Sequence, residues 1–135
     1  MRFMMLMYPG IGPEAENWEP SADDVAAMTA YNEELTKAGV LLSLDGLRPP
    51  ADGARVRFSG GTPTVTDGPF AEAKEVIGGY WVIQAASKEE AVEWASRCPA
   101  GDGDFIEVRR VYEMEDFPED VQEVAQLSER PPEQT

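Results

Sequence analysis

The side chains best suited to chemistry in this sequence are a few carboxylates and cations close to the ends of expected strands. Glu107 and Arg109 stand two residues apart in the segment 105–112, so in a strand they lie side by side on one face. A carboxylate beside an arginine has a lowered pKa, which makes it a poor general acid and suits the pair to orienting a polar ligand. An ion pair that bridges two subunits is the alternative role.

Asp67 is a second candidate and lies in the segment 66–70, which reads Thr-Asp-Gly-Pro-Phe. Asp, Gly and Pro in this order are typical of a turn, in which the Asp side chain accepts hydrogen bonds from the backbone amides that follow. The functional alternative makes Asp67 a general base, with Arg109 or Lys74 stabilising a developing oxyanion. Lys74 suits that role only when desolvated, and a solvated helix position or a salt bridge to Glu75 is the structural alternative.

Missing residue types exclude several kinds of catalysis. The chain has no histidine, which excludes triads built on an imidazole and most zinc sites. The carboxylates lack the spacing of a metal site, and no glycine-rich loop precedes a helix as a phosphate site requires. We therefore expect no metal and no cofactor.

Composition and charge narrow the possible partners. The chain has 135 residues, of which 42% are hydrophobic and 27% charged, as in ordinary globular domains. Eleven basic against 26 acidic residues give a net charge of −15, which repels nucleic acids and anionic lipids. The longest apolar run, residues 3–8, is far shorter than the ~20 residues of a membrane span and lacks the features of a signal peptide. We expect a soluble cytoplasmic protein that binds neither nucleic acid nor membrane.

The elements that position the candidate residues alternate between strands and helices. Ser21 and Ser87 each cap a predicted helix, with an acidic residue three positions later as capping-box partner, and Gly39 and Pro99 end these helices. Val25, Met28, Leu35 and Ala38 form the apolar stripe of the first helix. Hydrophobic patterns predict strands at residues 3–8, 40–44, 54–58, 62–66, 78–85 and 105–112.

Two β-α-β units with a hairpin between them predict an α+β fold of the ferredoxin-like type, an antiparallel sheet with two helices on one face. The hairpin insert, residues 54–66, is expected to have one wet face. Residues 3–8 are apolar at every position, so both faces of this strand need a cover. Because two helices cover only one face, we expect a homodimer in which a second copy covers the other.

Several other residues are expected to be structural. Asp45 precedes Gly46 and is most simply a turn former. Tyr31 lies near the edge of the apolar stripe of the first helix, and we expect it to pack. The single cysteine, Cys98, follows the apolar spacing of the second helix, and we expect it to be buried and inert. Tyr80 and Trp81 in the strand 78–85 are expected to be core residues. Only one of them can face the inside of the dimer, and we assign Tyr80 to the ligand site.

The sequence predicts a domain at residues 1–112 and an acidic C-terminal tail at residues 113–135. The tail has eight acids and one base. Val121, Val124 and Leu127 predict one short amphipathic helix in it, and residues 128–135 have the composition of a disordered segment.

Several strings together resemble the DGPF-type branch of the YCII-related (YciI-like) proteins, a family largely of unknown function. They are residues 66–75 (TDGPFAEAKE), 78–80 (GGY), 91–99 and 106–109 (IEVR), with residues 39–50 upstream. The resemblance covers roughly residues 2–112 and implies a ferredoxin-like subunit that pairs into a dimeric α+β barrel. It also implies, for some relatives, action on small cyclic or halogenated aromatic molecules through a His-Asp pair. Because this sequence has no histidine, Asp67 alone matches that pair.

Three hypotheses of function follow. The first is a small-molecule-binding homodimer whose cleft is lined by Asp67, Lys74, Tyr80, Glu107 and Arg109. The second is a cofactor-free lyase or isomerase that acts on a small cyclic or aromatic substrate, with Asp67 as the base. The third rests on the resemblance, which implies association with sigma factors of the extracytoplasmic-function type, here with the acidic tail as the contact.

Overall fold

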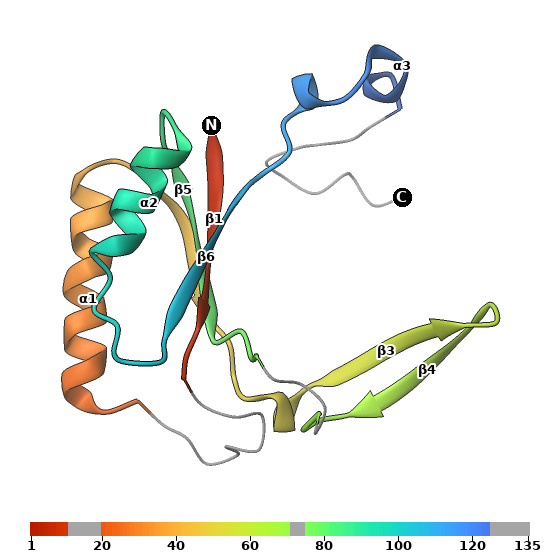
Figure 1. Cartoon of the computed structure of the whole chain (residues 1–135), viewed down its shortest axis with the longest axis horizontal. Coiled ribbons are helices and arrows are strands. Elements are labelled where there is room, and N and C mark those ends of the chain that lie inside the picture. The colour runs from red at the N-terminus through yellow and green to blue at the C-terminus, as the bar shows by residue number, and fades with distance from the viewer. Residues whose placement is uncertain (11–19, 71–74, 125–135) are drawn as a thin grey trace, which may run out of the picture.

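The computed structural model describes residues 1–10, 20–70 and 75–124, and its body is a sheet with two helices on one face (Figure 1). The sheet has four antiparallel strands in the order β2-β5-β1-β6. Its strands are β1 (Arg2–Tyr8), β2 (Leu41–Gly46), β5 (Gly79–Gln84) and β6 (Phe105–Arg110), and its helices are α1 (Ala22–Lys37) and α2 (Lys88–Ser96). This order confirms the α+β, ferredoxin-like architecture predicted from the sequence.

Both helices begin at the serines that the sequence predicts. Ser21 and Asp24 form a capping box, in which the Asp24 amide donates to Ser21 Oγ at 3.1 Å and the Ser21 amide donates to the Asp24 carboxylate at 3.4 Å. Ser87 Oγ accepts from the Glu90 amide at 3.1 Å, whereas the Glu90 carboxylate accepts from the Ala86 amide at 2.9 Å. Each helix start is therefore determined locally.

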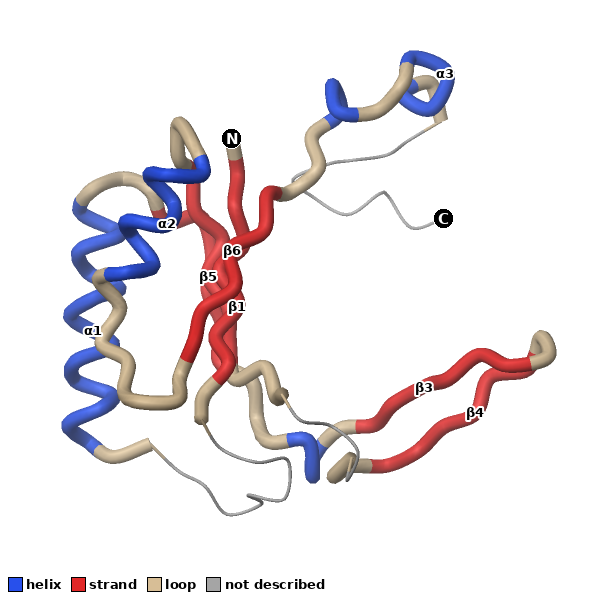
Figure 2. The backbone as a smooth tube through the Cα atoms, in the orientation of Figure 1, coloured by secondary structure: helices blue, strands red, loops and turns tan. Residues whose placement is uncertain are grey.

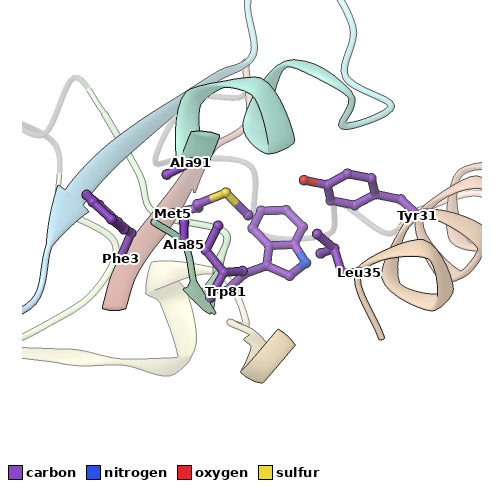
Figure 3. Close-up of a cluster of buried hydrophobic side chains, with 8 residues drawn as sticks. Phe3, Met5, Tyr31, Leu35, Trp81, Ala85 and Ala91 are labelled. Atoms are coloured by element: carbon purple, nitrogen blue, oxygen red, sulfur yellow. The ribbon is translucent and has the colours of Figure 1, made fainter. Parts of the chain in front are cut away.

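The core lies between the sheet and the helices, and Figure 3 shows Trp81 of β5 among side chains from both layers. Trp81 Nε1 donates to Asn32 Oδ1 at 2.8 Å, and the Tyr31 ring meets the indole edge to face at 5.7 Å between centroids. Among the described residues, the buried hydrophobic side chains of this core are Phe3, Met5, Tyr31, Leu35, Trp81, Ile83, Ala85 and Ala91.

The predicted stripe of α1 is only partly correct. Leu35 is buried and Met28 packs against the core, but Val25 and Ala38 are exposed. Tyr31 takes the central place instead, because its hydroxyl donates to the Trp94 carbonyl of α2 at 2.7 Å and thereby joins the two helices.

The hairpin of β3 (Ala54–Ser59) and β4 (Thr62–Asp67) leaves the body on the side opposite the helices (Figures 1 and 2). Its turn, Gly60-Gly61, has positive φ angles of 61° and 80°, which suit glycine. The sequence predicts one wet face, but within the single chain neither face of the hairpin is covered, since almost every side chain of the two strands is exposed. Its body contacts are confined to its base.

The C-terminal segment, which we define as residues 111–124, also leaves the sheet on that side (Figure 1). It contains a 3-10 turn (Met114–Asp116) and the single helical turn α3 (Glu119–Gln122). Arg2 binds Glu113 through two hydrogen bonds of 2.8 and 3.2 Å, which tie the segment to β1. The predicted tail helix is thus one turn long within the described residues, and Leu127 lies outside them.

Candidate functional site

The face of the sheet without helices gathers most of the predicted site residues, and we call it the open face. Its side chains alternate with the buried ones, so strand parity assigns them to this side. Leu6 lies opposite both Tyr80 and Glu107, and Met4 lies opposite both Val82 and Arg109. The open face comprises Met4, Leu6, Tyr8, Ser43, Asp45, Tyr80, Val82, Phe105, Glu107 and Arg109.

Tyr80 and Asp45 form a hydrogen-bonded pair on neighbouring strands. The Tyr80 hydroxyl donates to Asp45 Oδ2 at 2.9 Å, and this hydrogen bond, with the charge of the carboxylate, raises the pKa of Tyr80. The phenol therefore stays protonated, and its oxygen keeps lone pairs that can accept a hydrogen bond from a ligand. Asp45 acts as an acceptor for Tyr80 within β2 and is not the turn former that the sequence predicts.

Glu107 and Arg109 lie on β6 at the other side of the open face. Arg109 Nη1 is 3.5 Å from Glu107 Oε2, and both side chains are largely exposed. An exposed ion pair at this distance stabilises the fold little, so both groups can exchange it for a ligand or a partner. The parity argument placed this pair on one face, and the structure has it there.

The middle of the open face is apolar. Met4, Leu6 and Val82 are half-buried, and the rings of Tyr8 and Phe105 stack at 4.6 Å between centroids. A flat apolar molecule on this surface would lie between hydrogen-bonding groups of the protein, with Tyr80 on one side and Glu107 on the other. Their strands, β5 and β6, are separated by roughly two strand spacings of about 4.8 Å each. The arrangement is therefore suited to binding and orienting a small molecule.

Asp67 lies apart from this set. It is the last residue of β4, lies opposite Ala54 at the base of the hairpin, and is exposed. Within the described part of the chain, its carboxylate accepts no hydrogen bond, and the following amide, Gly68 N–H, donates to the Gly53 carbonyl at 3.0 Å instead. Lys74 lies outside the described residues. The structure thus brings three of the five predicted residues to one face, namely Tyr80, Glu107 and Arg109.

The base of the hairpin is held by close backbone packing. A Cβ atom built on Gly68 would lie 1.7 Å from the Pro50 carbonyl oxygen, so no larger residue fits there without backbone movement. The Arg55 guanidinium lies over the Phe70 ring at 4.2 Å from its centroid. These contacts explain why glycine follows Asp67 in the motif.

A cavity of about 560 Å³ on the helix side is a site that the sequence did not indicate. Asp104 lies at its edge, where the carboxylate accepts from the Gly10 amide at 2.7 Å and the Gly101 amide at 2.9 Å. The volume is in the usual range for small-molecule sites. It lies between one face of α1 and loops distant in sequence, and its described lining is Met7, Pro9, Gly10, Pro20, Asp24, Val25, Met28, Thr29, Asn32, Pro99, Gly101 and Asp104.

Other reactive groups are engaged or masked. Cys98 is half-buried, and burial together with the charge of Asp104 raises the pKa of its thiol to about 11, so little nucleophilic thiolate forms at neutral pH. Across the described ranges, His, Cys, Asp and Glu form no group of three or more that could hold a metal ion. None of the helices described is long and apolar enough to cross a membrane.

Comparison with known proteins gives the family. The model of the YCII-related domain matches residues 1–115. A protein of Rhizobium meliloti (strain 1021), named only as uncharacterised, is 35% identical over 80 residues. That match covers 58% of this chain and 64% of the relative, so the chain spans less than two thirds of the relative's length. Because the family match extends over most of the sequence, the chain belongs to the YCII-related domain family.

Proposed function

We propose that the protein is a homodimeric module that binds a small molecule between the open faces of two copies. The observation that carries this proposal is the open face itself, which has an apolar middle, a Tyr80–Asp45 pair on one side and Glu107–Arg109 on the other. The helices cover the opposite side of the sheet and leave this one for a partner (Figure 1). The resemblance to the DGPF-type branch agrees with this proposal.

Apolar side chains on the open face favour a second copy as the cover. Met4, Leu6 and Val82 occupy its centre, and soluble monomers rarely expose large contiguous apolar patches. A two-fold axis would place the same patch on both subunits, so one self-complementary surface would bury both.

The polar groups define the class of ligand. Glu107, Asp45 and the Tyr80 oxygen are acceptors, so they favour a ligand with hydroxyl or amine donors. Arg109 donates to an acceptor or a negative group on the same ligand. A small aromatic or cyclic molecule with such substituents fits the apolar centre and both sides.

Binding is supported better than cofactor-free catalysis. The proposed base, Asp67, lies on the hairpin, whereas the proposed oxyanion partner, Arg109, lies on β6. Within one chain these two residues belong to separate surfaces. A lyase or isomerase mechanism thus depends on a partner's hairpin, while the binding groups of the open face are already together.

Light scattering on three proteins tests the dimer. We expect the wild-type chain to scatter as a dimer, with twice the 14.8 kDa of one chain. Leu6→Lys places a charge in the centre of the open face and should yield monomers, whereas Val92→Lys, at an exposed position of α2, should remain dimeric. A monomeric wild-type protein at micromolar concentration would contradict the proposal.

Thermal-shift and calorimetric titrations with phenols, aromatic amines and lactones test the ligand. Tyr80→Phe and Glu107→Gln should each weaken binding of a hit by roughly fivefold to tenfold, the effect of one lost hydrogen bond. Thr29→Leu changes only the cavity on the helix side and serves as the control. Loss of binding in Thr29→Leu alone would move the ligand site to that cavity.

A further inference from the structure

The β3–β4 hairpin presents an uncovered apolar face. Its register pairs Val56 with Val65 and Phe58 with Pro63, so these four side chains lie on the same side of the ribbon. Phe58 is 80% exposed and Val65 is 64% exposed. A two-stranded ribbon that keeps such a face in water is only marginally stable, which indicates that something packs on it.

The C-terminal segment presents a second uncovered apolar surface. Tyr112 is 64% exposed on one side of its stack with Phe117, at 4.9 Å between ring centroids, and Val124 is 79% exposed. The segment is anchored to the sheet through Arg2–Glu113 and Arg110–Asp116, so its position is determined although Tyr112 and Val124 stay exposed.

The two elements carry opposite charges. The hairpin, residues 54–67, contains two arginines and one acid, Asp67 at its base, whereas residues 113–124 contain six acids and no base. Arg55 and Arg57 face the other side of the ribbon from Phe58, since their register partners are Thr66 and Thr64. In a chain with a net charge of −15, this hairpin is an unusual basic and apolar element, and the C-terminal segment complements it in both respects.

Within one chain the two surfaces cannot meet, because they extend from opposite ends of the sheet (Figures 1 and 2). Both extend on the side of the open face. Suppose that two copies face each other through their open faces and are related by a two-fold axis that lies between the sheets and perpendicular to the strands. The hairpin end of one sheet then lies opposite the C-terminal end of the other, so each hairpin reaches the partner's C-terminal segment. The symmetry produces two identical contacts, one at each end of the interface.

We infer that the β3–β4 hairpin of one protomer packs on the C-terminal segment of the other, so that two such contacts, one at each end of the interface, hold the homodimer together. This inference rests on the homodimer proposed above and adds its orientation and its second contact surface. The occupant of the apolar hairpin face is therefore a second copy of this chain. Phe58 is the central apolar contact, while Arg55 and Arg57 lie on the opposite side of the ribbon and attract the acids of the segment through their charge.

Charge reversal and rescue test this contact through the dimer dissociation constant, measured by sedimentation. Arg57→Glu should weaken the dimer at least about fivefold, and Arg48→Glu should leave it unchanged. Arg48 is a matched control because it is exposed and paired with Asp52 near the hairpin base, but does not lie on the ribbon. Adding Glu119→Lys and Asp120→Lys to Arg57→Glu should restore the wild-type constant.

Crosslinking provides a second measurement that does not depend on charge. In a Cys98→Ser background, one variant carries Phe58→Cys and another Val124→Cys, and a short bismaleimide reagent is added to their mixture. We expect a covalent dimer from the mixture and none when Val92→Cys replaces Val124→Cys. A dimer that neither crosslinks nor responds to Arg57→Glu contradicts the contact between the hairpin and the C-terminal segment but leaves the proposed function standing. A wild-type monomer overturns both.

Discussion

At the scale of single residues, Gly68 shows how packing rather than turn conformation selects an amino acid. The Pro50 carbonyl oxygen occupies the place of a Cβ atom at Gly68, at 1.7 Å, whereas at Gly53 the same oxygen is 3.5 Å away. We expect Gly68→Ala to destabilise the protein by about 1–3 kcal/mol through overpacking, and Gly53→Ala to be nearly neutral. Chemical denaturation of both variants measures this difference, and equal stabilities would contradict it.

Tyr80 supports a prediction on pH. Its hydrogen bond to Asp45 raises its pKa in the folded protein above the ordinary value of 10.0. As pH rises through 10, the unfolded chain loses this proton first, so the contribution of Tyr80 to stability is present below that pH and is lost above it.

Absorbance titration of the phenolate checks this prediction. The step that disappears in Tyr80→Phe identifies Tyr80, and Asp45→Asn should shift that step to lower pH because the carboxylate charge is removed. An unshifted step in Asp45→Asn would show that the pair is not formed in solution.

Strand parity was enough to place some site residues but not others. Glu107 and Arg109 could be predicted on one face, because alternation within a single strand decides it. The partner of Tyr80 could not, because Asp45 reaches it only through the register of β2 against β5, which has a bulge between Leu41 and Ser43. Register between strands is a property of the assembled sheet.

At the scale of elements, Tyr31 couples the two helices to each other and to the sheet. Its ring meets Trp81 edge to face, and its hydroxyl donates to the Trp94 carbonyl at 2.7 Å, while burial raises the pKa of the hydroxyl. Tyr31→Phe keeps the ring and removes one buried hydrogen bond, so we expect a loss of about 1 kcal/mol in the free energy of unfolding.

Leu35→Ala provides a reference against which the loss of stability in Tyr31→Phe can be compared. Leu35 is fully buried, and its truncation should cost about 2–5 kcal/mol because a cavity is left in the core. Urea denaturation of the two variants should therefore rank them clearly. A Tyr31→Phe variant as unstable as Leu35→Ala would show that the hydroxyl does more than bridge α1 and α2.

The elements themselves were largely predictable, because their signals are local. Ser21 and Ser87 mark the helix starts through capping bonds formed within three residues, and the alternation in residues 54–66 is typical of the hairpin that forms. The exposure of Phe58 was not predictable, because a strand pattern shows which side chains share a face but not what covers that face.

At the scale of the whole molecule, residues 3–8 carry the strongest sequence argument. Phe3 and Met5 are buried under the helices, while Met4 and Leu6 face the other way from the same strand. A strand that is apolar on both faces implies two covering layers, and the fold supplies one of them. Since the described residues place no second layer on the open face, the oligomeric state is the measurement that matters most for function.

The attachment of the C-terminal segment should make the molecule sensitive to acid. Hydrogen bonds from Arg2 lower the pKa of Glu113 in the folded state below its ordinary value of 4.5. A lowered folded pKa stabilises the protein above the unfolded value, and this stabilisation is lost as pH falls below 4.5. Glu113 joins the C-terminal segment to β1, so acid should release this segment from the sheet. The segment is the surface on which we propose that the partner's hairpin packs.

Melting temperatures from neutral to acidic pH test this linkage. Glu113→Gln should melt below wild type at neutral pH, and the two curves should converge as pH falls through 4.5, because protonation removes the same charge in the wild-type protein. Glu115→Gln is the control, as Glu115 is exposed in the same segment. Parallel curves for wild type and Glu113→Gln across this range would show that the Arg2–Glu113 bond does not hold the segment in place.

The oligomeric state of the wild type at acidic and neutral pH connects this bond to the dimer. A dimer at neutral pH that dissociates at acidic pH would link the Arg2–Glu113 bond to the proposed contact between the hairpin and the C-terminal segment.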